Sequence, residues 1–209
     1  MRFLFLLFPL SAAAAQVLNV TIVDYANVPP GTLAGAGQVL TEIYRTAGSQ
    51  LRLHVQTEEW RPDEPTGLDG VSGDIVLRIC SAEMARKLIQ RDSVLGYVQP
   101  TALGELRRVA TVFFHRVEMM NEATQTDTAR LLGAVLAHET GHLLLGRRSH
   151  SPQGIMRCPW DTEELIALRQ GRLRFDRRQA ESIVREIEAR TTAGNRPLRS
   201  AGPAKLERR

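Results

Sequence analysis

Apolar and polar positions follow two different periods along the first half of the chain. Short runs rich in β-branched residues, bounded by glycine, proline and polar clusters, predict five strands, at 17–23, 51–56, 74–80, 94–98 and 109–115. Between them, apolar residues recur at helical spacing in 32–46 and 82–90, and Gly48 follows the first of these segments as a stop signal. The first half of the chain therefore predicts a mixture of strands and helices.

The longest predicted helix begins after Asp127, a residue type that commonly caps helix N-termini, and runs without a breaker to Leu145. Gly146 ends it, and a loop containing glycine and prolines occupies 147–160. A last helix is predicted over 177–189, where three branched apolar residues form one side. After residue 115 the chain therefore predicts helices without further strands.

A chain of 209 residues has the size of one domain or of two small lobes around a cleft. The predicted elements favour a single α+β domain at 16–190, with an upper lobe at 16–146 and a smaller lower lobe at 147–190. From Thr191 the chain is rich in glycine, proline, arginine and serine and has little to bury. Residues 191–209 therefore predict a disordered tail.

Residues 1–15 have the features of a signal peptide. A basic residue, Arg2, precedes a short apolar run and an Ala-x-Ala end, so cleavage is expected near Ala15/Gln16. The apolar run is shorter than the roughly 20 residues that a membrane-spanning helix needs. We therefore expect export to the periplasm or outside the cell, with no membrane anchor in the mature form.

The charge and the cysteine content exclude few classes of function. The formal net charge is +4, aromatic residues make up only 5% of the chain, and no nucleic-acid recognition motif occurs, so we do not expect nucleic-acid binding. Cys80 and Cys158 allow one disulfide in an oxidising compartment. The alternative is that either thiol is a small buried residue or a metal ligand.

Three of the five histidines fall within 138–150. His138 and His142 are four residues apart on the predicted helix, so both imidazoles project from one face and can reach one zinc ion at about 2.0–2.1 Å. Glu139, beside the first histidine, can accept a proton from a water molecule that the metal activates. This His-Glu-x-x-His pattern predicts one catalytic zinc ion, with Glu139 as general base. His54 and His115 lie in predicted strands and are expected to be ordinary surface or cavity residues.

A catalytic zinc ion usually has three protein ligands and one open position, so a third ligand is required. His150 is the preferred candidate, because Gly146 allows a sharp turn at the helix end that can return the chain to the metal. The alternatives are three downstream acids, Asp161, Glu163 and Glu164. A downstream glutamate serves another class of zinc peptidases, the gluzincins, although acids at these positions also suit the first turn of a helix at 161–168.

The segment His138-Glu139-Thr140-Gly141-His142, followed by Gly146, His150 and Gly154-Ile155-Met156, resembles the metzincin zinc peptidases, with matrixins and archaemetzincins as the closest analogues. The resemblance implies His138, His142 and His150 as zinc ligands, Glu139 as the base and Met156 beneath the zinc in a methionine turn. The spacing departs from the family pattern His-Glu-x-x-His-x-x-Gly-x-x-His. Gly146 is four residues after His142, and His150 is four after Gly146, so each step has one extra residue.

The resemblance extends to the order of the elements. It implies an α/β/α-like upper lobe with a mixed, twisted sheet and two main helices, one of them carrying the active site, and a small C-terminal lobe with the methionine turn and one helix. The strand at 94–98 is the candidate for the family's edge strand, which binds extended substrates by β-augmentation. Trp160 and Leu165 follow the turn, where they could form a wall of the substrate pocket or pack in the core.

Two classes of function fit these residues. The first is a secreted, monomeric zinc endopeptidase that acts on peptides or proteins. The second is a non-catalytic binding domain that uses zinc to fold, although such a domain would not need Glu139. The predicted elements fill the chain between Gln16 and the zinc helix, so no inhibitory pro-segment is expected.

Overall fold

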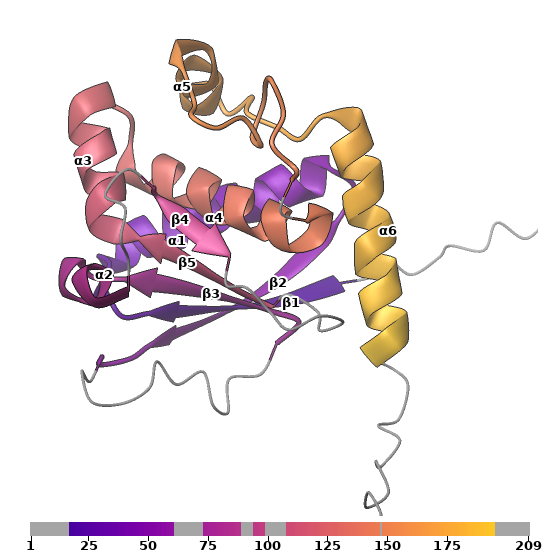
Figure 1. Cartoon of the computed structure of the whole chain (residues 1–209), viewed down its shortest axis with the longest axis horizontal. Helices are drawn as coiled ribbons and strands as arrows, with labels where there is room; N and C mark the ends of the chain where they lie inside the picture. Colours follow the sequence, from indigo (N-terminus) through magenta and orange to yellow (C-terminus); the bar gives the residue numbers. More distant parts are fainter. Residues whose placement is uncertain (1–16, 61–72, 89–93, 99–107, 147, 195–209) are drawn as a thin grey trace, which may run out of the picture.

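The computed structural model describes residues 17–60, 73–88, 94–98, 108–146 and 148–194, and the five predicted strands form one sheet in it (Figure 1). The strands are β1 Val17–Asp24, β2 Gln50–Thr57, β3 Ile75–Cys80, β4 Gly96–Val98 and β5 Val109–Phe113. Their order is β2-β1-β3-β5-β4, and neighbouring strands are parallel except for the antiparallel pair β4 and β5. The sheet is therefore mixed, and β4 is an edge strand, as predicted.

Six helices occur in the described ranges: α1 Pro30–Thr46, α2 Ala82–Leu88, α3 Phe114–Thr124, α4 Thr128–Leu145, α5 Thr162–Arg169 and α6 Arg177–Gly194. Helices α1 and α4 lie against the same face of the sheet (Figure 1). The short helix α2 packs Met84 and Ala85 against Cys80 and Phe113, whose side chains point to the opposite face. These layers confirm the predicted α+β fold.

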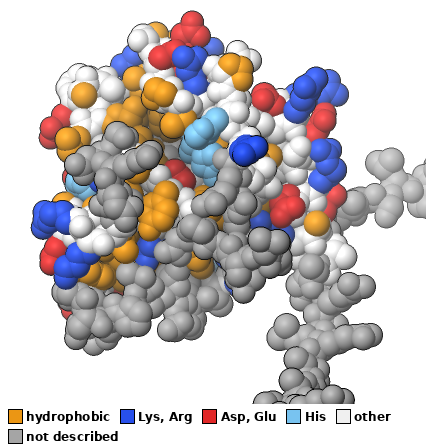
Figure 2. Space-filling view, in the orientation of Figure 1, with side chains coloured by type: hydrophobic (Ala, Val, Ile, Leu, Met, Phe, Trp, Pro, Cys, Tyr) orange, Lys and Arg blue, Asp and Glu red, His pale blue; other side chains and the backbone are white. Residues whose placement is uncertain are grey.

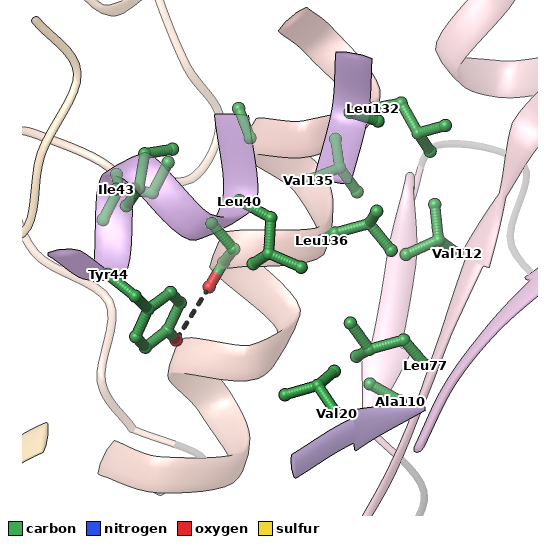
Figure 3. Packing of buried hydrophobic residues seen from close by; sticks show 14 of the residues in the cluster. Val20, Leu40, Ile43, Tyr44, Leu77, Ala110, Val112, Leu132, Val135 and Leu136 are labelled. Atoms are coloured by element: carbon green, nitrogen blue, oxygen red, sulfur yellow. Dashed lines mark hydrogen bonds between the residues drawn. The ribbon is translucent and has the colours of Figure 1, made fainter. Parts of the chain in front are cut away.

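The main core lies between the sheet and the two long helices (Figure 3). Successive strand residues point to opposite faces, so one set of apolar side chains from each central strand meets the helices. The labelled contributors are Val20, Leu77, Ala110 and Val112 from the sheet, Leu40 and Ile43 from α1, and Leu132, Val135 and Leu136 from α4. The hydroxyl of Tyr44 on α1 donates a hydrogen bond to the carbonyl of Ala137 on α4, at 3.3 Å.

Helix α4 has the bounds that the sequence predicts. The Asp127 carboxylate accepts a hydrogen bond from the backbone N–H of Arg130 at 2.9 Å, which caps the N-terminus. Gly146 ends the helix with φ of 93°, a conformation that side chains disfavour. Most of α4 is buried, because it lies between α1, the sheet and the lower lobe. No helix in the described ranges is both long and apolar enough to cross a membrane.

The predicted strand at 109–115 is too long. Strand β5 ends at Phe113, and α3, which the sequence analysis did not predict, begins at Phe114. Phe114 and Val117 are both buried, and their spacing of three residues is a helical one. The residues before them form a β-branched and aromatic run that is typical of a strand. The change from strand spacing to helical spacing is therefore not evident from the sequence. His115 is consequently on a helix.

The lower lobe contains α5 in addition to the predicted last helix. Helix α5 begins with a capping box, in which Asp161 and Glu164 each accept a hydrogen bond from a backbone N–H of the first turn. Helix α6 starts at Arg177 as predicted and continues to Gly194, so the helix extends beyond its predicted end at Ala189. The proposed signal peptide and residues 195–209 lie outside the described residues.

Candidate metal centre

Helix α4 and the loop after it bring three histidines together. The Nε2 atoms of His138 and His142 are 3.0 Å apart, and those of His142 and His150 are 3.1 Å apart. All three ligand atoms lie within 4.8 Å of one another, and no other group of potential ligands of this kind occurs among the described residues. The turn at Gly146 thus returns His150 to the helix face, as the sequence predicts for the third ligand.

The other ring nitrogens of two histidines have partners that fix the tautomers. Nδ1 of His138 lies 2.7 Å from the carbonyl oxygen of Ile155, which can only accept, so this Nδ1 is the donor. Nδ1 of His142 lies 2.9 Å from the Ser149 hydroxyl, which already donates its hydrogen to the carbonyl of Gly146. The hydroxyl must accept from His142. In the neutral rings of both residues, Nε2 therefore presents a lone pair to the centre.

Burial sets the charge states at this site. It lowers the pKa of His138 to about 4, despite the opposing effect of the hydrogen bond to Ile155, so this imidazole is neutral at pH 7. Burial also raises the pKa of the Glu139 carboxyl to about 8. A neutral imidazole is the form that binds a metal ion.

The carboxylate of Glu139 lies directly beneath the edge strand. A Cβ atom at Gly96 in β4 would come within 2.8 Å of Oε1 of Glu139 and 2.7 Å of the carbonyl oxygen of Thr111, so only glycine fits there. The Glu139 side chain is 5% exposed, and its Oε2 has no hydrogen-bond partner. An unpartnered buried carboxylate is costly, so its presence calls for a functional explanation.

Met156 is fully buried and packs against α4 at Gly141. A Cβ atom at Gly141 would approach the Met156 sulfur to 2.5 Å, so the glycine makes room for this side chain. The preceding residue, Ile155, provides the carbonyl that orients His138 and also accepts a hydrogen bond from Trp160 at 3.1 Å. The segment predicted as the methionine turn thus contacts the metal-binding helix.

The three acidic alternatives for the third ligand are not in the cluster. Asp161 caps α5 and pairs with Arg157 at 2.6 Å, and Glu163 is an exposed residue of the first helical turn. Glu164 is buried, accepts from the backbone N–H of Gly154 at 3.3 Å and pairs with Arg157 at 3.3 Å. These acids therefore stabilise the lower lobe instead of completing the metal centre.

The remaining histidines and both cysteines lie apart from the cluster. His54 is exposed on β2, and His115 is half-buried on α3. Both thiols are free, so the disulfide that the sequence allowed does not form. Burial raises the pKa of Cys80 to about 12, whereas Cys158 is exposed and lies at the cleft beside the histidines.

A cleft of about 500 Å³ opens at the three histidines and Glu139. Its other described lining residues come from the β4 segment, from α3 and α4, and from the loop before α5: Val94, Leu95, Gly96, Tyr97, Val98, Met120, Val135, Arg157, Cys158, Pro159 and Trp160. Trp160 and Leu165 both pack against the main core, and Trp160 is also a wall residue of the cleft. Near the centre of Figure 2, the pale blue histidine side chains lie beside a group of orange hydrophobic side chains.

Sequence reasoning did not find Ser149 as the partner of His142 or Gly96 as the neighbour of Glu139. Ser149 immediately precedes the third histidine, which is a weak signal, because serine is common in loops. Gly96 gave a clearer signal as a glycine inside a strand pattern, which often marks a close approach of another group. Neither signal identifies the contacted residue.

Comparison with solved structures identifies similar folds. The chain resembles archaemetzincin from Methanopyrus kandleri with a TM-score of 0.55 and 17% sequence identity, covering 83% of this chain and 97% of that one. It also matches a zinc-dependent peptidase from Methanocorpusculum labreanum, with a TM-score of 0.48 and 17% identity over 78% of this chain and 99% of that one. No family model and no curated protein matches the sequence. The first similarity confirms the predicted fold, and the likeness to matrixins stays a prediction.

Proposed function

We propose that this protein is a zinc-dependent endopeptidase that hydrolyses peptide bonds of peptide or protein substrates. The observation that carries the proposal is the convergence of three imidazole Nε2 atoms beside the buried carboxylate of Glu139, at an apolar cleft. The similarity in fold to archaemetzincin supports it. The proposal assigns the metal to His138, His142 and His150.

The geometry of the three histidines fits zinc. Tetrahedral coordination at about 2.0–2.1 Å places neighbouring ligand nitrogens roughly 3.3 Å apart. The His138–His142 and His142–His150 separations of 3.0 and 3.1 Å are close to this value, and all three ligand atoms lie within 4.8 Å of one another. In addition, the Nε2 lone pairs of His138 and His142 face each other, an arrangement that a cation between them stabilises. Three imidazole nitrogen ligands beside an open cleft are the donor set of a catalytic site.

A bound zinc ion would supply a Lewis acid that polarises the scissile carbonyl and makes a water molecule more acidic. Glu139 lines the cleft, and its unpartnered Oε2 can accept the proton of the attacking water. Burial alone holds its pKa near 8, and the positive charge of a nearby cation lowers that pKa, which favours the ionised base at neutral pH. The same carboxyl group can then donate the proton to the departing amine.

Strand β4 is the surface on which we place the substrate backbone. It is an edge strand of three residues that, among the described residues, pairs with β5 alone, and it lines the cleft next to Glu139. An extended peptide can pair with such an edge by main-chain hydrogen bonds. This pairing would hold the scissile carbonyl over the three histidines, because β4 and the histidines border the same cleft.

The decisive variant is Glu139→Gln, which keeps the shape of the side chain and removes the base. We expect about one zinc ion per chain in both the wild type and the variant, with peptidase activity reduced by roughly 10²-fold or more. Metal analysis and cleavage of an unstructured protein, with and without a chelator, measure both properties. Glu163→Gln is the matched control, because this exposed residue of α5 lies outside the site and should retain full activity.

The alternative is a non-catalytic domain that uses zinc only to fold. It predicts that the wild type and Glu139→Gln both bind about one zinc ion per chain and that neither cleaves an unstructured protein. A wild-type protein that binds zinc and cleaves nothing would support this alternative. Cleavage that survives in Glu139→Gln would instead show that another group is the base.

We also propose that the chain is exported, because residues 1–15 have the composition and Ala-x-Ala end of a signal peptide. Expression of the full chain in a bacterial host should then yield a mature protein that begins at Gln16 outside the cytoplasm. N-terminal sequencing of the fractionated protein tests this expectation. Recovery of the chain from the cytoplasm with residues 1–15 intact would contradict it.

A further inference from the structure

Strand β4 is short, and its main-chain groups alternate between the sheet and the open edge. The N–H of Phe113 donates to the carbonyl of Leu95 at 2.9 Å, next to the three residues that pair with β5. In an antiparallel pair, hydrogen-bonded positions alternate with positions whose main-chain groups point away from the partner strand. Because Leu95 is a hydrogen-bonded position, Gly96 and Val98 direct their main-chain groups away from β5, to the side on which no described strand lies. These are the groups with which an extended peptide can pair.

Arg116 connects the start of α3 to the segment that leads into β4. It is the third residue of α3 and is buried, with only 8% of its surface exposed. Its Nη1 donates to the carbonyl of Val94, two residues before β4, at 2.6 Å. Its guanidinium carbon lies 4.6 Å from the centre of the Phe113 ring, a cation–π contact with the last residue of β5. One side chain therefore joins α3, β5 and the β4 segment.

Without these contacts, the position of Arg116 would be unfavourable for an arginine. Burial of a guanidinium costs free energy unless hydrogen bonds compensate for the lost hydration. A positive charge in the first turn of a helix is also opposed by the helix dipole. The contacts with Val94 and Phe113 offset both costs. The arginine therefore serves the β4 segment more than it serves α3.

The Phe113 ring extends this support to β4 itself. The ring of Tyr97, the central residue of β4, stacks with it at a centroid distance of 6.0 Å and an interplanar angle of 15°. The residue before Tyr97 is Gly96, where a Cβ atom would come within 2.8 Å of Oε1 of Glu139. The clearance between the edge strand and the metal-binding helix is thus small, and it depends on how firmly the β4 segment is held.

We propose that Arg116 is a positioning residue that holds the β4 edge where a substrate backbone can pair with it beside the three histidines. The proposal rests on the proposed function, because it concerns how the same cleft receives its substrate. Arg116 is absent from the described lining of the cleft. It acts through the Val94 carbonyl and the Phe113 ring, which hold the segment from the side of α3 and β5.

Amide hydrogen exchange tests the first step, the hold on the β4 segment. Arg116→Met keeps a long side chain and removes the charge and the donors, so backbone amides at 94–98 should exchange about tenfold faster. The amides of α4 should exchange at the wild-type rate, which shows that the variant is folded. Arg116→Lys keeps a cation and a donor without the planar fork, so its increase should be about threefold. Arg169→Met is the matched control, because the Arg169 guanidinium donates to the carbonyl of Thr124 at the opposite end of α3.

Binding of two hydroxamates to the zinc-loaded full chain tests the second step. Acetohydroxamate contacts only the metal centre, whereas a hydroxamate with an Ala-Thr-Ala-Thr arm is long enough to pair with β4 as well. In calorimetric titrations, Arg116→Met should weaken the peptide hydroxamate about tenfold and leave the affinity of acetohydroxamate unchanged. The same peptide hydroxamate with N-methylated amides cannot donate hydrogen bonds to β4, so the substitution should not change its affinity. Arg116→Lys should lie between the wild type and Arg116→Met, and it carries the same comparisons should the methionine variant not fold.

Failure of this inference and failure of the proposed function give different results. Wild-type exchange at 94–98 in Arg116→Met, or an equal loss of affinity for both hydroxamates, would overturn the role of Arg116. An equal loss for the peptide hydroxamate in Arg169→Met would overturn it too. If the wild type cleaves no protein, the proposed function fails, while faster exchange at 94–98 and a selective loss of peptide binding still support the positioning role.

Discussion

Two oxygen atoms outside the proposed metal coordination fix the orientation of the two histidine ligands on α4. The Ile155 carbonyl accepts from Nδ1 of His138, and the Ser149 hydroxyl accepts from Nδ1 of His142. Each contact holds the imidazole plane and leaves Nε2 as the nitrogen available to zinc. Because Ile155 provides a backbone atom, only the Ser149 contact can be removed by a side-chain substitution.

Substitution of Ser149 by alanine should weaken zinc binding about 10- to 100-fold, since removal of such a supporting hydrogen bond releases the His142 ring. Competition with a chromogenic chelator measures the affinity. Ser151→Ala is the matched control, because the Ser151 hydroxyl donates to the carbonyl of Gln153, away from the histidines. Equal zinc affinity of the Ser149 variant and the wild type would show that the ring is held by other contacts.

At the scale of elements, the candidate metal centre connects α4 to the loop that follows it. Two ligands come from the last two turns of the helix, and the third from beyond Gly146. The helix end is also held by α6, because the Arg190 guanidinium donates to the carbonyl of Leu143 at 2.7 Å and pairs with Glu186. This interaction satisfies one of the carbonyls that a helix C-terminus leaves without an internal partner.

Removal of zinc should therefore lower the thermal stability of the folded chain. At a free zinc concentration 1,000 times the dissociation constant, binding contributes about 4 kcal/mol to the free energy of unfolding, which corresponds to a midpoint higher by roughly 8–16 °C. Differential scanning calorimetry with zinc and with a chelator measures the difference. His150→Ala should reduce the difference, whereas His54→Ala, on the exposed edge strand β2, should preserve it. An unchanged midpoint on chelation of a zinc-loaded sample would contradict the site.

A helix or strand could be predicted where the signals within its own sequence were sufficient to determine its type and its ends. Helix α4 was predicted with its bounds because an Asp cap, a long apolar stretch and a terminal glycine all indicate the same segment. Helix α3 was missed because its first residue, Phe114, continues the apolar run of β5. Burial of Phe114 and Val117 by neighbouring elements selected the helical period, and a local propensity does not contain that information.

For the molecule as a whole, the cleft exists because segments distant in sequence meet around α4. The β4 segment, α3 and the loop at 157–160 all border the same space. The antiparallel pairing of β4 with β5 places Gly96 over Glu139. The similarity to archaemetzincin at 17% identity shows that the fold itself is compatible with very different sequences.

The sequence by itself determined the local features: the positions of the strands along the chain, the bounds of α4, and the spacing that puts His138 and His142 on one helical face. These features follow from periodicity and capping within a few residues. Only the tertiary structure decided that His150 instead of Glu164 joins them, that both cysteines are free, and that Gly96 covers Glu139. Each of these outcomes depends on the position of one segment relative to another, which is set by the packing of the whole core.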